Sequence, residues 1–343
     1  MPCCRVSRPE VADTLHAARC TLYGLLRTLY VARSTRYSAP CTMHYALCTV
    51  LFAAVSITAT ASAQELEPRL MSNVPRGMNF AIVGYGYSRG NVLLDPSIPI
   101  ENLDSKLHTM VAAYVRSIEL FGQAGKIDAV VPFARGDWTG VLQGQDTSRA
   151  ITGFGDPRIR LSWNSFGSPS LSGAEFRSYR QGTIVGASIQ VFVPLGQYDP
   201  TKLINLSANR WTFRPQLGVS QAVGPWLLEA YASAWFFTTN SDFFGGSTVT
   251  QQPLFAGKIH VIRLLPKGFW IAVDGGYGVG GRTFLDGERR ETHISSFRFG
   301  ATVAVPLARQ HTLKFVLASG ARIEMGPDFD AIAVSYQFRW GGM

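Results

Sequence analysis

Cysteine is missing from most of this sequence. The five cysteines all precede residue 64, at Cys3, Cys4, Cys20, Cys41 and Cys48. Residues 64–343 therefore form no disulfide and provide no thiolate for a metal. The sequence also has no Cys/His cluster with metal-ligand spacing, no phosphate-binding loop and no dinucleotide fingerprint, so we expect neither a metal nor a cofactor.

Long apolar runs and basic runs are also lacking after residue 63. No stretch there is long and apolar enough for a transmembrane helix, which excludes an inner-membrane protein but leaves a membrane β-barrel open. Lysine and arginine are spread along the chain without a basic run or a basic helix interleaved with aromatics. We therefore expect no nucleic-acid partner.

An apolar segment at residues 43–63 ends in Ala61-Ser62-Ala63. Such a small-residue ending is typical of a cleaved signal peptide, so we expect export and a mature start at Gln64. The alternative is a membrane anchor, but the Ala/Ser/Thr-rich second half disfavours it. Residues 1–42 are interpreted as an extension upstream of a true start at Met43, or else as a long basic n-region. Removing residues 1–63 lowers the formal net charge from +9 to about +5, because that segment has six arginines and two acids.

A strict alternation of side chains follows the GFGDP sequence at residues 153–157. Arg158 and Arg160 fall on one face, whereas Ile159, Leu161 and Trp163 fall on the other. A period of two predicts a β-strand with one apolar and one charged face. This pattern fits a soluble sandwich, and it also fits a membrane barrel with lipid outside and a wet lumen inside.

About twelve segments can be read as strands of this kind. They are residues 78–89, 107–120, 126–134, 157–164, 183–194, 211–221, 226–238, 253–263, 269–279, 294–306, 311–320 and 330–340. Their number and length predict that residues 64–343 form one all-β, antiparallel transmembrane barrel in the outer membrane of a Gram-negative bacterium. Only about a dozen residues precede the first strand, so we expect no plug domain.

Connections of alternating length support the barrel over the sandwich. Long ones are expected at residues 91–106, 135–156, 195–210, 239–252, 280–293 and 322–329, and short ones at 122–125, 222–225 and 307–310. Outer-membrane barrels have long outside loops and short periplasmic turns, and an even strand count places both the N- and C-termini in the periplasm. Residues 165–182 break this rule, and they hold either a small helix or a missed hairpin.

Three sequences carry a resemblance to a known family. GFGDPRIRLSWN at 153–164, FVPLGQYDPTKLINLSANRWTFRPQLG at 192–218 and YQFRW at 336–340 resemble outer-membrane transporters of the phenol meta-degradation pathway. The resemblance extends from about Gly77 to Trp340, and it implies a transmembrane barrel that takes up aromatic or other hydrophobic compounds. The last strand also resembles the aromatic-ended signal that the barrel-assembly machinery reads during insertion.

If the apolar face points to lipid, the other face lines a lumen. The candidate lumen or substrate-contact residues are Arg158, Arg160, Arg214, Glu229, Lys258, His260, Asp274, Arg298, Lys314 and Arg339. Their basic groups outnumber the two acids, which predicts a positive lumen that favours anionic solutes. Alternatively, the charges pair across strands and only fill the barrel.

Polar residues also gather in the long connection at 195–210. The candidates for a constriction are Asp199, Lys202, Asn205, Asn209 and Arg210. Long loops often carry function, so this one is read either as an inward-folded constriction or as a hydrogen-bonded loop that stiffens the rim. Aromatics at strand ends, namely Trp163, Trp211, Trp226, Trp235, Phe236, Phe237, Trp270 and Trp340, are interpreted as interfacial girdles.

The function predicted from these patterns is a passive outer-membrane channel for small hydrophobic, aromatic or anionic compounds. Its partners would be outer-membrane lipids and the solute itself. The alternative is a non-conducting barrel that acts as a lipid-modifying enzyme or a structural or binding protein. His293 and Ser295 share a strand face, as in outer-membrane lipases, but no asparagine follows them to orient the base. We therefore expect no enzyme and no catalytic residue.

Overall fold

The computed structural model describes residues 66–90, 101–142, 144–325 and 329–342. The expected signal peptide at 43–63 and the extension at 1–42 lie outside the described residues, as does most of the connection expected at 91–106. Among the described residues, no helix is both long enough and apolar enough to span a membrane.

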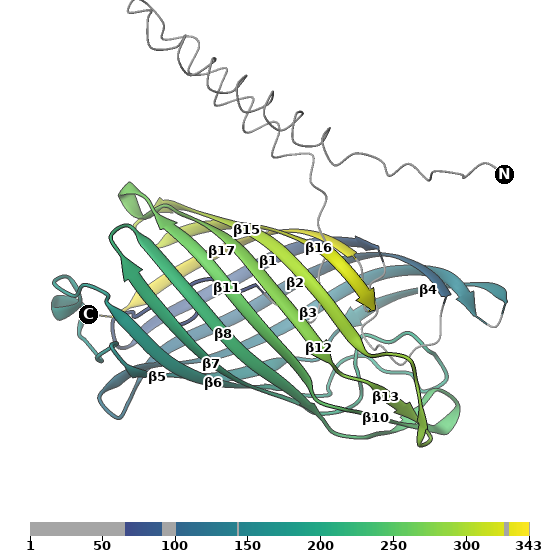
Figure 1. The fold of residues 1–343 in the computed structure, drawn as a ribbon. Coiled ribbons are helices and arrows are strands. Elements are labelled where there is room, and N and C mark those ends of the chain that lie inside the picture. Colours follow the sequence, from purple (N-terminus) through teal and green to yellow (C-terminus); the bar gives the residue numbers. More distant parts are fainter. Residues whose placement is uncertain (1–65, 91–100, 143, 326–328, 343) are drawn as a thin grey trace, which may run out of the picture. The chain divides into compact units, whose positions relative to one another are not determined.

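The wall of the barrel is built from thirteen strand segments (Figure 1). They are β1 (Met78–Gly90), β2 (Glu101–Leu120), β3 (Gln123–Leu142), β4 (Gln145–Phe154), β5 (Arg158–Phe166), β6 (Thr183–Phe192), β7 (Thr212–Val223), β8 (Trp226–Phe237), β11 (Leu254–Leu264), β12 (Trp270–Gly280), β15 (Ile294–Ala308), β16 (His311–Met325) and β17 (Phe329–Gly341). All neighbours pair antiparallel.

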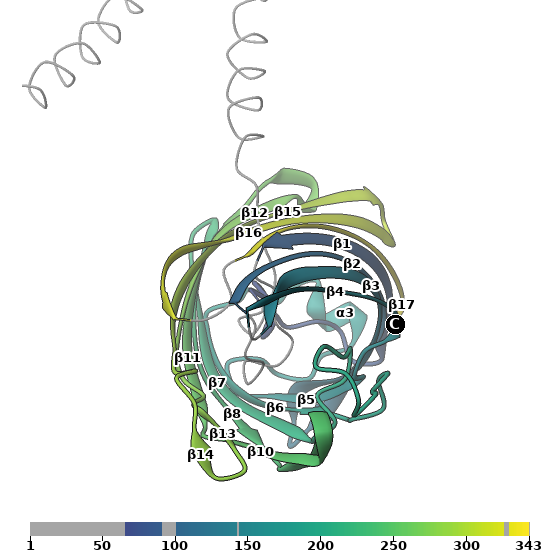
Figure 2. The ribbon, with the colours of Figure 1, turned by 90° about the vertical axis from the view of Figure 1, so that its right-hand side faces the viewer.

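The ring closes where β1 pairs with β17, from Met78 opposite Gly341 to Gly90 opposite Phe329. One end of β3 pairs with β5 and the other end with β4, so these two segments occupy the place of one interrupted strand. The wall therefore counts twelve strands, which confirms the expected all-β antiparallel barrel. Figure 2 shows the wall as a ring in end view.

The side-chain faces are the reverse of those in a soluble protein. Leu217, Ile259 and Val273 point outward and are 67%, 59% and 65% exposed, whereas Lys258 and Asp274 point inward and are buried. Because strand residues alternate between faces, this inversion repeats around the ring. An apolar exterior around a polar interior is the arrangement of a membrane barrel.

One expected loop is instead mostly strand. Residues 135–156 were expected to connect two strands, but β3 continues to Leu142 and β4 then runs back beside it from Gln145. The outward residues Arg135, Asp137 and Thr139 are exposed and polar, whereas the buried inward residues, among them Trp138, are apolar or small. The alternation therefore continues, but with the polar residues on the outer face. These strand ends project beyond the apolar exterior.

The two ends of the barrel differ. The turn end carries the tight turn at Phe121–Gly122, the start of β1 and the end of β17. There, residues 167–182 include the one-turn helix α3 (Gly173–Phe176), which has a capping box, so of the two alternatives for this connection the structure shows the small helix.

At the opposite, loop end, the connections that follow β8 and β12 form a second small sheet. It consists of β9 (Asn240–Phe243), β10 (Ser247–Gln251), β13 (Thr283–Leu285) and β14 (Glu288–Arg289). The one-turn 3-10 helices η2 (Phe244–Gly246) and η3 (Pro266–Gly268) lie at the loop end and the turn end, respectively.

We predict that Ile159→Arg destabilises the barrel by roughly 2–4 kcal/mol, because it places a charge on the apolar exterior. The Ile159 side chain points outward and is 49% exposed. Thr152→Arg is the matched control, since Thr152 also points outward but lies opposite Arg135 on the polar strand ends. Urea unfolding from lipid vesicles measures both. Equal destabilisation by the two variants would contradict a membrane wall at Ile159.

Candidate solute passage

The residues before β1 lie inside the barrel at the turn end. We call residues 66–77 the N-terminal segment. The Lys126 ammonium donates to the Leu70 carbonyl at 2.8 Å, and the Asn164 amide donates to the Met71 carbonyl at 2.9 Å. The Arg69 backbone N–H donates to Glu229 at 2.8 Å, and Met71 is fully buried. The sequence predicts no plug domain, and the structure places this short segment itself in the lumen.

An ion-pair network fastens this segment to the wall. Arg160 donates from Nη1 to Glu67 at 2.5 Å and from Nε to Asp128 at 2.9 Å. Arg158 also lies within 3.9 Å of Glu67. Burial raises the pKa of Glu67, but the charges of Arg160, Lys258 and Arg214 outweigh it and lower that pKa to about 2. The carboxylate thus remains ionised inside the barrel.

A second polar group lies further along the inner wall. The Arg214 guanidinium donates to Gln190 at 3.3 Å and to Gln216 at 3.0 Å, and it stacks 4.5 Å from the Trp235 ring. The Lys258 ammonium lies 5.9 Å from the Tyr231 ring, and Arg298 is buried on the same inner face. A planar guanidinium group stacks on an aromatic face without losing its charge. These ring contacts therefore hold the basic side chains of the wall inside the lumen.

The acids of the inner wall are held in hydrogen bonds. His260 Nδ1 lies 2.5 Å from Asp274, whose other oxygen accepts from Thr302 at 3.2 Å. Glu229 accepts from Ser220 and from Tyr231, both at 3.0 Å. The inner wall also includes Lys126 and Asp128, which the sequence reading left unassigned.

A cavity of about 680 Å³ lies at the turn end, between the N-terminal segment and the wall. Seven basic side chains line it against one acid, Asp128; they are Arg69, Lys126, Arg160, Lys267, Arg309, Lys314 and Arg339. Arg339 differs from the other lumen candidates because it is exposed at the end of the strand, where it donates to the Arg309 carbonyl. The other nine lie on the inner face, buried or half-buried.

At the loop end, the connection between β6 and β7 folds inward. We call residues 193–211 the inner loop. Its Ile204 and Leu206 pack into an apolar cluster with Leu107 and Trp138 of the wall. Asp156 anchors it by accepting from the backbone N–H groups of Gly196 and Ala208, both at 3.0 Å.

The polar residues of the inner loop have separate roles. Asp199 accepts from Thr201, and Asn205 donates to the Asp199 and Lys202 carbonyls, so these form a self-bonded turn. Asn209 donates to Asn240 at 3.1 Å. Arg210 donates to Gln251 at 2.6 Å and stacks on Phe237. The loop is therefore folded inward and internally hydrogen-bonded, and its role as a constriction remains a prediction.

Several aromatic residues were placed wrongly by the sequence reading. Trp235 is 5% exposed and stacks on Arg214 in the lumen, and Trp270 lines the turn-end cavity beside Arg69. Neither belongs to an outer girdle. Trp138, which fell in an expected loop, is 1% exposed and is the largest fully buried side chain. The continued alternation around Trp138 was the signal that could have placed it.

The possible catalytic pair is not assembled into a site by any contact described in the structure. The Ser295 hydroxyl lies 3.1 Å from the Tyr277 hydroxyl. His293 precedes β15, and Ser295 shares a face with the outward Phe299 rather than with the lumen residue Arg298. Within the described residues, no three His, Cys, Asp or Glu side chains gather to hold a metal.

The closed wall, apolar exterior and charged interior define a twelve-stranded β-barrel of the outer-membrane type. The chain belongs to the family described as "Putative MetA-pathway of phenol degradation", whose model matches residues 95–321. The resemblance inferred from the sequence is therefore confirmed. No match to a curated protein was found.

Several solved structures are similar to this chain. The COG4313 outer membrane channel from Pseudomonas putida F1 is 18% identical, with a TM-score of 0.67 over 80% of this chain and 100% of that one. The transport unit of the autotransporter AIDA-I from Escherichia coli is 11% identical, with a TM-score of 0.48 over 88% and 99%. The NanC porin is 9% identical, with a TM-score of 0.42 over 75% and 98%. The first of these supports the barrel architecture.

We predict that the N-terminal segment stays docked at pH 4, where an ordinary glutamate is mostly protonated, and is released as the pH approaches 2. A pKa lowered from 4.5 to about 2 stabilises the docked state above pH 4.5, and this contribution is lost between these values as the pH falls. Amide hydrogen exchange of residues 66–77, corrected for the intrinsic effect of pH, measures release.

The variant Glu67→Gln should speed this exchange already at pH 7, because it removes the charge that Arg160 binds. Glu288→Gln is the control, since Glu288 is exposed in the small sheet at the other end. If both variants exchange like the unaltered protein, the ion pair does not hold the segment.

Proposed function

We propose that this protein is an outer-membrane channel for the passive passage of small solutes, with the loop end outside and both termini in the periplasm. The apolar exterior supports a place in lipid, and the polar interior supports a wet passage. The family description adds a link to phenol degradation, which favours aromatic compounds as cargo.

The observation that carries the proposal is the excess of basic groups on the inner wall. Seven of the ten lumen candidates are Arg or Lys, and the turn-end cavity repeats this imbalance. The acids Glu67, Asp128, Glu229 and Asp274 are each bound by a cation or hydrogen-bond donors. A positive potential within low-dielectric walls concentrates anions, so the channel should prefer them over cations of matched size.

The passage is narrow, because the N-terminal segment and the inner loop both take up space in the lumen. The segment is fastened by charges and the inner loop by apolar packing. A solute passes beside these elements or after one of them moves. A non-conducting barrel would also be obstructed by two such elements. The bilayer experiment below therefore includes absence of current as one of its outcomes.

We predict anion selectivity in planar bilayers under a salt gradient. Replacing Arg158, Lys258 and Arg298 together by Gln should shift the reversal potential toward zero selectivity, since all three lie on the inner face. Arg160 is left intact because its loss would strand Glu67 and Asp128 without their cation.

The control replaces Lys106 and Arg135 by Gln, since both are exposed on the outer face of the projecting strand ends. Selectivity should be unchanged in this variant. Cation preference in the unaltered protein would contradict the proposal. Absence of any current, including in Glu67→Gln, would favour a non-conducting barrel.

We predict the topology from the position of exposed residues. A cysteine at Glu288, in the small sheet, should react with an impermeant maleimide on intact cells. A cysteine at Lys267, in the turn between β11 and β12, should react only after the outer membrane is permeabilised. Both side chains are exposed, so access from outside the cell and not burial decides the result. A loop-end residue such as Ser207 of the inner loop would be unsuitable for labelling, because its side chain is buried. Labelling of Lys267 on intact cells would reverse the orientation.

A further inference from the structure

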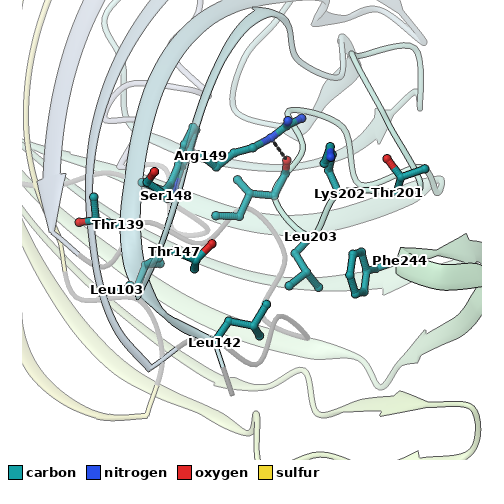
Figure 3. Close-up of a pocket in the computed structure, with 13 residues that line it drawn as sticks. Leu103, Thr139, Leu142, Thr147, Ser148, Arg149, Thr201, Lys202, Leu203 and Phe244 are labelled. Carbon is teal, nitrogen blue, oxygen red and sulfur yellow. Dashed lines mark hydrogen bonds between the residues drawn. The ribbon is translucent and has the colours of Figure 1, made fainter. Parts of the chain in front are cut away.

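A separate pocket at the loop end has a composition unlike that of the charged lumen. It lies between the projecting ends of β2, β3 and β4, the inner loop and η2, and has a volume of about 280 Å³ (Figure 3). Pockets for small molecules begin at about this size. Its lining comes from segments far apart in the sequence, so the site exists only because the inner loop folds back against the wall.

The pocket is divided into an apolar and a cationic side. Leu142, Leu203 and Phe244 lie on one side in Figure 3, whereas the nitrogen-bearing ends of Arg149 and Lys202 lie on the other. Trp138 and Leu103 complete the apolar lining. None of the described residues that line the pocket is acidic, and Thr147 and Thr201 supply hydroxyl groups.

The cations are positioned but keep donors available. Arg149 donates from Nε to the Ile204 carbonyl at 3.3 Å, which fixes the side chain against the inner loop. Its two terminal nitrogens have no described partner, and Lys202 is exposed. Asp199, whose carboxylate feels the charge of both cations, does not line the pocket, and Thr201 already donates to it twice. These hydrogen bonds are the largest cause of the lowered pKa of Asp199. The charges of Lys202 and Arg149 lower that pKa further, which places both cations in one region.

We propose that this pocket binds small amphipathic carboxylates, with the apolar body of the solute against Leu142, Leu203 and Phe244 and the carboxylate against Arg149 and Lys202. A planar guanidinium binds a carboxylate through two parallel hydrogen bonds, which suits Arg149 to this role. This inference rests on the proposed channel function, because the pocket is an entry site only if the barrel conducts the solute. Binding itself can be measured without any current.

The test is equilibrium dialysis of benzoate against the purified protein in detergent micelles. Benzoate should bind saturably, whereas benzylamine lacks the anion and acetate lacks the apolar body, so both should bind much more weakly. The double variant Arg149→Gln, Lys202→Gln should weaken benzoate binding by about tenfold or more, because it removes both cationic donors to the carboxylate. Leu203→Gln should also weaken it.

Two controls separate this pocket from general attraction of anions. Arg135→Gln removes a cation from the outer face of neighbouring β3, and Lys314→Gln removes one from the turn-end cavity. Neither should change benzoate binding. The fold of each variant is checked by the heat-dependent gel mobility typical of intact barrels, and Lys202→Gln alone is the milder variant because its side chain is exposed.

Each outcome decides the proposal. No saturable benzoate binding, or binding weakened by Lys314→Gln but not by the Arg149 and Lys202 variants, would overturn it. So would equal binding of benzylamine. Saturable binding lost only in the Arg149, Lys202 and Leu203 variants would support it. If that result holds while bilayers show no current, the channel function fails and the binding site stands.

Discussion

The structure depends on closure of a ring of backbone hydrogen bonds. Apart from β4, which pairs only with β3, every strand of the wall has a neighbour on each side, because β1 and β17 meet along their full lengths. In lipid no water satisfies an exposed strand edge, so an open sheet of this kind would leave costly unpaired groups. Closure forces one residue of every two outward, and the exterior must then be apolar. The charged residues have only the lumen to occupy.

Filling that lumen is therefore an electrostatic problem as much as a packing problem. Arg160 is buried between Glu67 and Asp128, and Asp274 is bound by His260 and Thr302. Removing one partner of such a pair leaves an uncompensated charge, which costs more than the pair contributes. The N-terminal segment belongs to this balance, because its Glu67 adds a second acid beside Arg160 and lies within 3.9 Å of Arg158.

Most of the fold could be predicted from the sequence, because alternation reports directly which face of a strand meets lipid. Arg158 and Ile159 show this in two adjacent residues. Alternation stops predicting a membrane wall where the polar residues face outward, as at Arg135 and Asp137, and for that reason the end of β3 and all of β4 are predicted as a loop. Alternation also does not predict which side chains contact one another inside the barrel. The contact of Glu67 with Arg160 joins residues 93 apart, and no period links an irregular segment to a strand.

The two elements that fill the lumen use different forces, and this gives the proposed passage two unlike regions. At the turn end, charges fasten the N-terminal segment beside a basic cavity. At the loop end, Ile204 and Leu206 fasten the inner loop by apolar packing, and an amphipathic pocket results. Salt screens the attraction between exposed charges, whereas apolar packing involves no charges to screen. A solute with an apolar body and one negative charge is the class that both regions would stabilise. A cation would be disfavoured in each, and a neutral hydrocarbon would gain only at the loop end.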